Sequence, residues 1–80
     1  MVTPEQVRDY IAQGMACDVL EVRGDGHHFE ATIVSAAFQG LNRVRQHQHV
    51  YAVLGDRMRA EIHALSMQTF SPAEWQARQA

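Results

Sequence analysis

The sequence predicts a small α+β domain in which helices pack on one face of a three-stranded sheet, in the order α-β-β-α-β-α. Two short stretches of alternating apolar residues flank the turn-forming segment Gly24-Asp25-Gly26, which indicates a β-hairpin. A third stretch, Ile62 to Phe70, lacks Gly and Pro and lies between turn-prone residues, so it predicts the remaining strand. Apolar residues at helical spacing fill most of the rest. The 80 residues predict one domain, 1–80.

Composition narrows the class of protein. An apolar content of 46% allows a small core, and a single cysteine rules out an intramolecular disulfide, as is typical of a reducing compartment. No apolar run approaches the roughly 18–20 residues of a membrane span, and the N-terminal segment has no apolar signal core. We therefore expect a cytoplasmic protein without a membrane partner. The net charge of −2 argues against a nucleic-acid binder that uses its whole surface.

The first helix has a clear beginning. In Thr3-Pro4-Glu5-Gln6, Thr3 can cap the helix, proline suits the first turn, and Gln6 occupies the third helical position of a capping box. Val7, Tyr10 and Ile11 follow at helical spacing. Gly14 is expected to end the helix.

The hairpin follows this helix. We expect its first strand over Cys17 to Arg23 and its turn at Gly24-Asp25-Gly26. His27 and His28 then lie where the chain leaves the turn. The alternating apolar residues of the second strand are Phe29, Ala31 and Ile33.

The middle of the chain predicts a long helix. Residues 35–41 form a connection, Asn42 can cap the helix, and the helix is expected to run to about Arg59. Gly55 is expected to loosen its last turn. The predicted buried stripe consists of Val44, Tyr51, Leu54 and Met58.

In the third predicted strand, His63 lies among apolar residues. Because adjacent strand residues point to opposite faces, His63 should face away from the surface shared by Ile62 and Ala64. Ser71-Pro72-Ala73-Glu74 is a second capping box, and it opens a short C-terminal helix anchored by Trp75.

The residues favour a protein without catalytic activity. No paired carboxylates, nucleophile elbow or phosphate loop is present, and Cys17 is expected to be a buried, unreactive thiol. Neutral imidazole is a ligand of iron, zinc and copper, so His63, His27 and His28 are candidate metal ligands. Spacing alone leaves the alternative that these histidines are solvent-exposed without a role.

Five motifs in order resemble one family. They are Gly24-Asp25-Gly26-His27-His28-Phe29, Phe38-Gln39-Gly40, Val50-Tyr51, Ile62-His63-Ala64-Leu65-Ser66 and Pro72-Ala73-Glu74-Trp75. Together they resemble the BolA family, and within it the IbaG-like branch. Two departures stand out: the segment before the His63 strand is about one residue shorter, and Gln46-His47-Gln48 replaces the Arg-His-Arg of many BolA proteins.

The resemblance implies a BolA-like fold related to class II KH domains, with a mixed sheet whose third strand is parallel to one of the others. It also implies an adaptor that binds a monothiol glutaredoxin, with or without a bridging [2Fe–2S] cluster, in iron–sulfur cluster handling or iron and redox signalling. The implied ligands are His63 and His28, with His27 as a lower-ranked competitor. A [2Fe–2S] cluster has four ligands, so the glutaredoxin and glutathione would supply the others. The isolated protein is then expected to hold no cofactor and to be a monomer or weak homodimer.

The alternative is a nucleic-acid-binding transcriptional regulator that uses the helix from Asn42. Arg43 and Arg45 are the candidate contacts with DNA. The KH-type loop is incomplete, since Gly40-Leu41-Asn42-Arg43 lacks the second glycine. A solvated helix surface is the simpler interpretation of these charges.

Overall fold

The computed structural model describes residues 2–79 and confirms the predicted fold class. One mixed sheet has the strand order β1-β2-β3, with β1 antiparallel to β2 and β2 parallel to β3. The elements are α1 (Pro4–Gly14), β1 (Val19–Gly24), β2 (His28–Val34), the short 3-10 helix η1 (Ala36–Phe38), α2 (Arg43–Leu54), α3 (Asp56–Ala60), β3 (Ala64–Phe70) and α4 (Pro72–Gln79).

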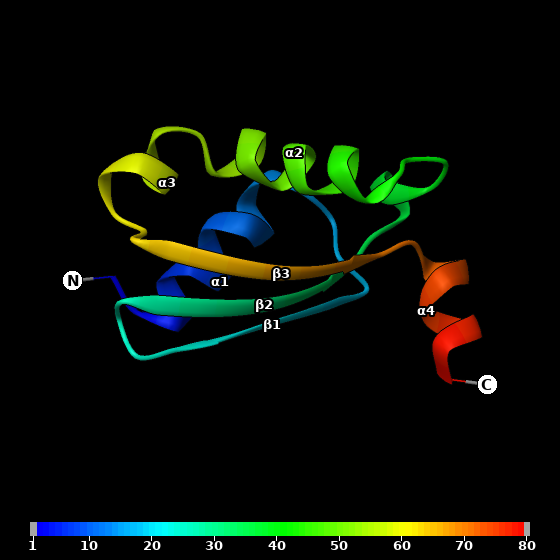
Figure 1. Cartoon of the computed structure of the whole chain (residues 1–80), viewed down its shortest axis with the longest axis horizontal. Helices are drawn as coiled ribbons and strands as arrows, with labels where there is room; N and C mark the ends of the chain where they lie inside the picture. Colours follow the sequence, from blue (N-terminus) through cyan, green and yellow to red (C-terminus); the bar gives the residue numbers. More distant parts are fainter. Residues whose placement is uncertain (1, 80) are drawn as a thin grey trace.

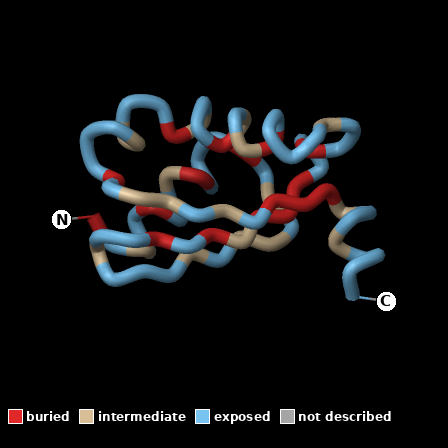
Figure 2. The backbone as a smooth tube through the Cα atoms, viewed as in Figure 1, coloured by how far each residue is buried: buried red, intermediate tan, exposed pale blue. Residues whose placement is uncertain are grey.

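The core lies between the sheet and the helices α1 and α2. In Figure 1, α4 extends beyond the end of β3 and does not cover the sheet. The central strand presents Phe29, Ala31 and Ile33 to the core, as the alternating pattern predicts. Figure 2 shows the buried segments on the inner sides of these layers. The helix residues that meet the strand in the core are Val7, Ile11, Val50 and Leu54.

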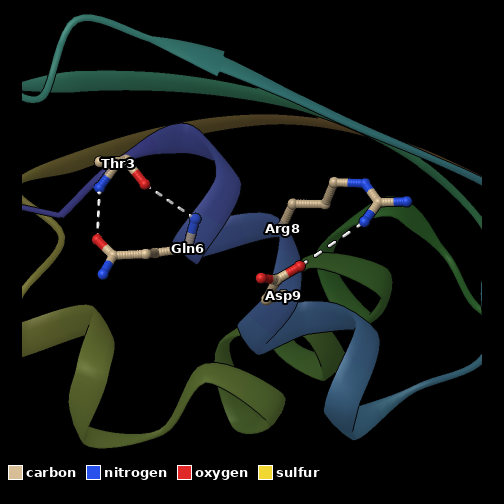
Figure 3. A network of polar contacts seen from close by, with 4 residues as sticks. All are labelled: Thr3, Gln6, Arg8 and Asp9. Carbon is tan, nitrogen blue, oxygen red and sulfur yellow. Dashed lines mark hydrogen bonds and ion pairs between the residues drawn. The ribbon is translucent and has the colours of Figure 1, made fainter.

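Both predicted capping boxes are present. Thr3 Oγ1 accepts a hydrogen bond from the N–H of Gln6 (3.1 Å), and Gln6 Oε1 accepts one from the N–H of Thr3 (2.9 Å), as Figure 3 shows. At α4, Glu74 Oε1 accepts from the N–H of Ser71 (2.8 Å), and Ser71 Oγ accepts from the N–H of Glu74 (3.2 Å). These bonds satisfy N–H groups that have no partner inside a helix.

The prediction of one continuous helix to Arg59 is wrong. The helix α2 ends at Leu54, and the separate helix α3 follows from Asp56 to Ala60. Gly55 between them has φ of 58°, in the left-handed region that favours glycine. Gly55 therefore divides the predicted helix in two, a stronger effect than the expected loosening of a last turn.

The predicted stripe on this helix is partly wrong. Val44 is 65% exposed and Tyr51 is 41% exposed, whereas Leu54 is buried as predicted. The buried face is rotated toward Gln46 and Val50. A Cβ atom on Gly14 would lie 2.4 Å from Cγ1 of Val53, so the missing side chain lets α1 approach α2 closely on this side.

A polar side chain at the centre of α2 is almost fully buried. Gln46 is 1% exposed, and its Nε2 donates to the carbonyl of Leu41 (3.0 Å) and to Glu74 Oε1 (3.1 Å). Its Oε1 accepts from Thr69 Oγ1 at 2.7 Å. Since every polar group of the amide has a partner, burial of Gln46 is compatible with a stable core and links α2 to β3 and α4.

Candidate metal-binding site

Three exposed histidines meet at one end of the sheet. The β1–β2 turn carries His27, β2 begins at His28, and His63 directly precedes β3. Figure 1 shows this turn and the start of β3 at the same end of the molecule. The His63 ring centre lies 6.3 Å from that of His27 and 6.5 Å from that of His28, with the rings nearly perpendicular. Segments more than thirty residues apart in the chain thus bring the candidate ligands together.

Strand pairing produces this proximity. In the parallel β2–β3 ladder, His28 lies opposite Ala64, so the residue before Ala64 falls beside the hairpin exit. The prediction that His63 lies inside the strand is wrong by one residue, because β3 begins at Ala64. The N–H groups of Glu61 and Ile62 still donate to the carbonyl of Arg57, so the backbone here closes the preceding helix instead of pairing with β2.

His63 is exposed as predicted, but the predicted surface shared by Ile62 and Ala64 is wrong, because Leu65 and Met67 are the strand residues that pack against the core. Ile62 is 3% exposed and belongs to the core, whereas His63 is exposed to solvent. The buried isoleucine therefore anchors the segment, and the imidazole next to it is free to meet a partner.

The carboxylate of Asp25 orders the two hairpin histidines, a role that sequence reasoning missed. Asp25 Oδ1 accepts hydrogen bonds from the N–H groups of both His27 and His28, each at 2.9 Å. These two bonds, that from His28 first, lower the pKa of Asp25. An Asp placed two residues before a turn exit is the sequence signal for this Asx-type arrangement. A Cβ on Gly24 would lie 2.5 Å from the His28 carbonyl, so the turn also requires glycine there.

Ring distances do not separate His27 from His28 as a partner of His63. An open depression distinguishes them, since it is lined by His27 and His63 together with Arg59 and Glu61, and His28 is not part of it. The choice of His28 over His27, which the family resemblance implies, stays a prediction.

The ring separations can be compared with those of two imidazole ligands on one metal ion. Two imidazoles bound through nitrogens at about 2 Å have ring centres roughly 5–6 Å apart, slightly less than the 6.3 and 6.5 Å found here. Among residues 2–79, no group of three or more His, Cys, Asp or Glu side chains could hold a metal ion. The described residues therefore offer at most a partial ligand set at this end of the sheet.

Cys17 does not contribute to this end of the molecule. It is half-buried and precedes β1, which begins at Val19 and not at Cys17 as predicted. Burial raises the pKa of the Cys17 thiol, so the reactive thiolate is disfavoured.

The two arginines considered for nucleic acid have different surroundings. The Arg43 guanidinium donates to the carbonyl of Thr69 and lies 5.4 Å from the centre of the Phe70 ring. Arg45 is exposed. Burial and the charge of Arg43 hold the pKa of His47 below its usual range, so His47 adds little positive charge. Arg43 and Arg45 therefore do not form a joint free cationic patch.

Comparison with known proteins identifies the family of this chain. The family model described as BolA-like protein matches residues 11–74, and the chain belongs to the BolA family. It is 41% identical over 56 residues to the DNA-binding transcriptional regulator BolA of Haemophilus influenzae, covering 70% of this chain and 54% of that protein. The chain thus spans about half the length of that relative.

Two further proteins match over most of their lengths. The acid stress protein IbaG of Escherichia coli (strain K12) is 32% identical over 71 residues, which cover 88% of this chain and 84% of IbaG. The solved structure of a BolA protein homologue from Coxiella burnetii has a TM-score of 0.82 and 38% identity, covering 95% of this chain and 99% of that one. The family predicted from the five motifs is confirmed.

Within residues 2–79, the structure contains no helix with both the length and the apolar character that a membrane crossing requires.

Proposed function

We propose that this protein is a non-catalytic, cytoplasmic BolA-type adaptor that pairs with a monothiol glutaredoxin and contributes histidine ligands to a shared [2Fe–2S] cluster. The observation that carries the proposal is the convergence of His63 with His27 and His28 at one exposed end. Imidazole is an established replacement for thiolate on such clusters.

The incomplete ligand set supports a partner. A [2Fe–2S] cluster has four protein or thiol ligands, and this end of the chain offers at most three imidazoles. Thiolates from a glutaredoxin and its glutathione would complete the set. His63 is the first ligand in this proposal, and His28 is the second, with His27 as its competitor.

The test mixes the purified protein with a cluster-loaded monothiol glutaredoxin and follows visible absorption and circular dichroism. An altered spectrum that saturates at equimolar ratio supports the proposal, and His63→Ala should abolish the alteration while the fold is retained. His49→Ala is the matched control, because His49 packs edge-on against Phe38 (6.0 Å between ring centres), away from the site. A wild-type spectrum in the His63→Ala complex would remove His63 from the ligand set.

Substitutions of His27 and His28, tested side by side, identify the second ligand. We expect His28→Ala to lose the native spectrum and His28→Cys to retain more of it, since thiolate is the commoner ligand. If His27→Ala loses the native spectrum and His28→Ala retains it, the second ligand is His27. The depression that His27 shares with His63 favours this alternative.

The second candidate function is DNA binding, which the name of the Haemophilus influenzae relative favours. Arg43→Ala with Arg45→Ala should then weaken DNA affinity and lower its salt dependence by about one unit for each phosphate interaction that the substitutions remove. The single variants add information, because only Arg45 lacks the contacts that hold Arg43 on Thr69 and Phe70. Unchanged DNA affinity in the double variant would exclude this helix as the binding surface.

A further inference from the structure

The segment that leads into His63 is weakly held by its own helix. The helix α3 has five residues, none of them buried, and no side chain caps its N-terminus. It follows Gly55, which has a left-handed backbone conformation. A helix this short is not stable alone, so its position depends on the surfaces against which it packs.

One tyrosine from α1 contacts both ends of this helical turn. The guanidinium of Arg57 lies 4.1 Å from the centre of the Tyr10 ring. The hydroxyl of the same tyrosine donates to Glu61 Oε1 at 2.8 Å. Arg57 and Glu61 are also joined through the backbone, because the N–H of Glu61 donates to the carbonyl of Arg57 (2.9 Å). The ring thus contacts the beginning of the turn and its hydroxyl bonds to the end.

This contact lies close to the candidate site. His63 follows Glu61 by two residues, and both line the depression that includes His27. The intervening Ile62 is buried and its N–H donates to the Arg57 carbonyl at 3.1 Å. A shift of the Glu61 end of the turn would therefore move the backbone that carries His63.

We propose that Tyr10 is a positioning residue for His63, acting through its hydrogen bond to Glu61. The proposal deepens the function proposed above and rests on it for the role of His63 as a ligand. Its physical basis is that the bond links α1, which is anchored in the core by Val7 and Ile11, to the last residue before the Ile62-His63 segment.

The test uses the full chain with the substitutions Tyr10→Phe, Glu61→Ala and Glu61→Gln. Tyr10→Phe keeps the ring and its contact with the Arg57 guanidinium and removes only the donor. Glu61→Gln keeps an acceptor oxygen and should rescue what Glu61→Ala loses. Tyr51→Phe is the matched control, because Tyr51 is an exposed tyrosine on α2.

The first readout needs no partner. In nuclear magnetic resonance spectra, Tyr10→Phe and Glu61→Ala should shift the His63 imidazole signals and speed amide exchange at Ile62 roughly two- to tenfold, the range expected for one hydrogen bond. Tyr51→Phe should resemble the wild type in both measurements, and Glu61→Gln should resemble it in the amide exchange rate at Ile62. Unchanged His63 signals in Tyr10→Phe would overturn the proposal, as would equal effects of Glu61→Gln and Glu61→Ala.

The second readout is affinity for cluster-loaded monothiol glutaredoxin, which should weaken by the same roughly two- to tenfold in Tyr10→Phe and Glu61→Ala. Wild-type affinity in both variants would show that Tyr10 does not position the ligand. Failure of the wild-type protein to alter the glutaredoxin spectrum would instead refute the proposed function, and the partner-free His63 signals would still decide whether Tyr10 positions this residue.

Discussion

Replacement of Gln46 by alanine should be among the most destabilising changes on α2. The side chain is 1% exposed and makes three hydrogen bonds, to the Leu41 carbonyl, to Glu74 and from Thr69. Each such bond contributes about 0.5–1.5 kcal/mol net, and the buried Thr69 hydroxyl left without its partner adds to the loss. We expect Gln46→Ala to lower the free energy of unfolding by about 3 kcal/mol. For a domain of this size, that corresponds to a fall in Tm of about 12–24 °C.

Urea denaturation and thermal melting, both followed by circular dichroism, measure this loss. Gln48→Ala is the control, because Gln48 is exposed on the same helix and its loss should stay within about 0.5 kcal/mol of the wild type. Thr69→Val removes the donor to Gln46 Oε1, so the two substitutions should be non-additive in a double-mutant cycle. A Gln46→Ala variant as stable as Gln48→Ala would refute the reasoning.

Three further predictions concern the remaining helices. The hydrogen bond from the N–H of Ser71 is the main cause that lowers the pKa of Glu74, so the stability from this carboxylate is present above the unfolded pKa of about 4.3 and is lost as the pH falls through the folded pKa. Glu74→Gln should therefore reduce the change in the urea midpoint between pH 5 and pH 3. A variant with the same pH dependence as the wild type would contradict this prediction. Gly14→Ala should destabilise the protein by about 1–3 kcal/mol, because its Cβ would lie 2.4 Å from Val53 Cγ1. Adding Val53→Ala should relieve this loss. A Gly14→Ala variant that is more stable than the wild type in thermal melting would contradict the prediction. Gly55→Ala should cost about 1–3 kcal/mol through its φ of 58° and ψ of −134°, since a Cβ there meets only the Ala52 carbonyl oxygen at 3.9 Å but strains the backbone, and a neutral result in urea denaturation would exclude that strain.

Local interactions explain what could be predicted from the sequence. The two capping boxes at Thr3 and Ser71 involve residues three apart, so their pattern alone located the beginnings of α1 and α4. The alternation at Phe29, Ala31 and Ile33 reports the period of a strand, and the structure buries all three. The order of the elements, the hairpin and the family resemblance depend on such short-range patterns.

The course of α2 depended on packing between segments distant in the chain. Apolar spacing favoured Val44 and Tyr51 as buried, but the buried face is rotated toward Gln46 and Val50, and Val53 on the same helix approaches Gly14 closely. Gln46 is buried on that side because Thr69 and Glu74 supply its hydrogen bonds. No pattern within the helix encodes those partners.

The candidate site was also only partly predictable from the sequence. The sequence identified His63, His27 and His28 by residue type and by family resemblance, and it predicted that His63 would be exposed. The parallel register of β2 and β3 brings the His63 ring to within 6.5 Å of the His27 and His28 rings, and Asp25 orders the hairpin backbone. Side-chain chemistry and local periodicity are properties of short segments and are legible in the sequence. Proximity between segments more than thirty residues apart arises only when strand pairing and core packing place them together.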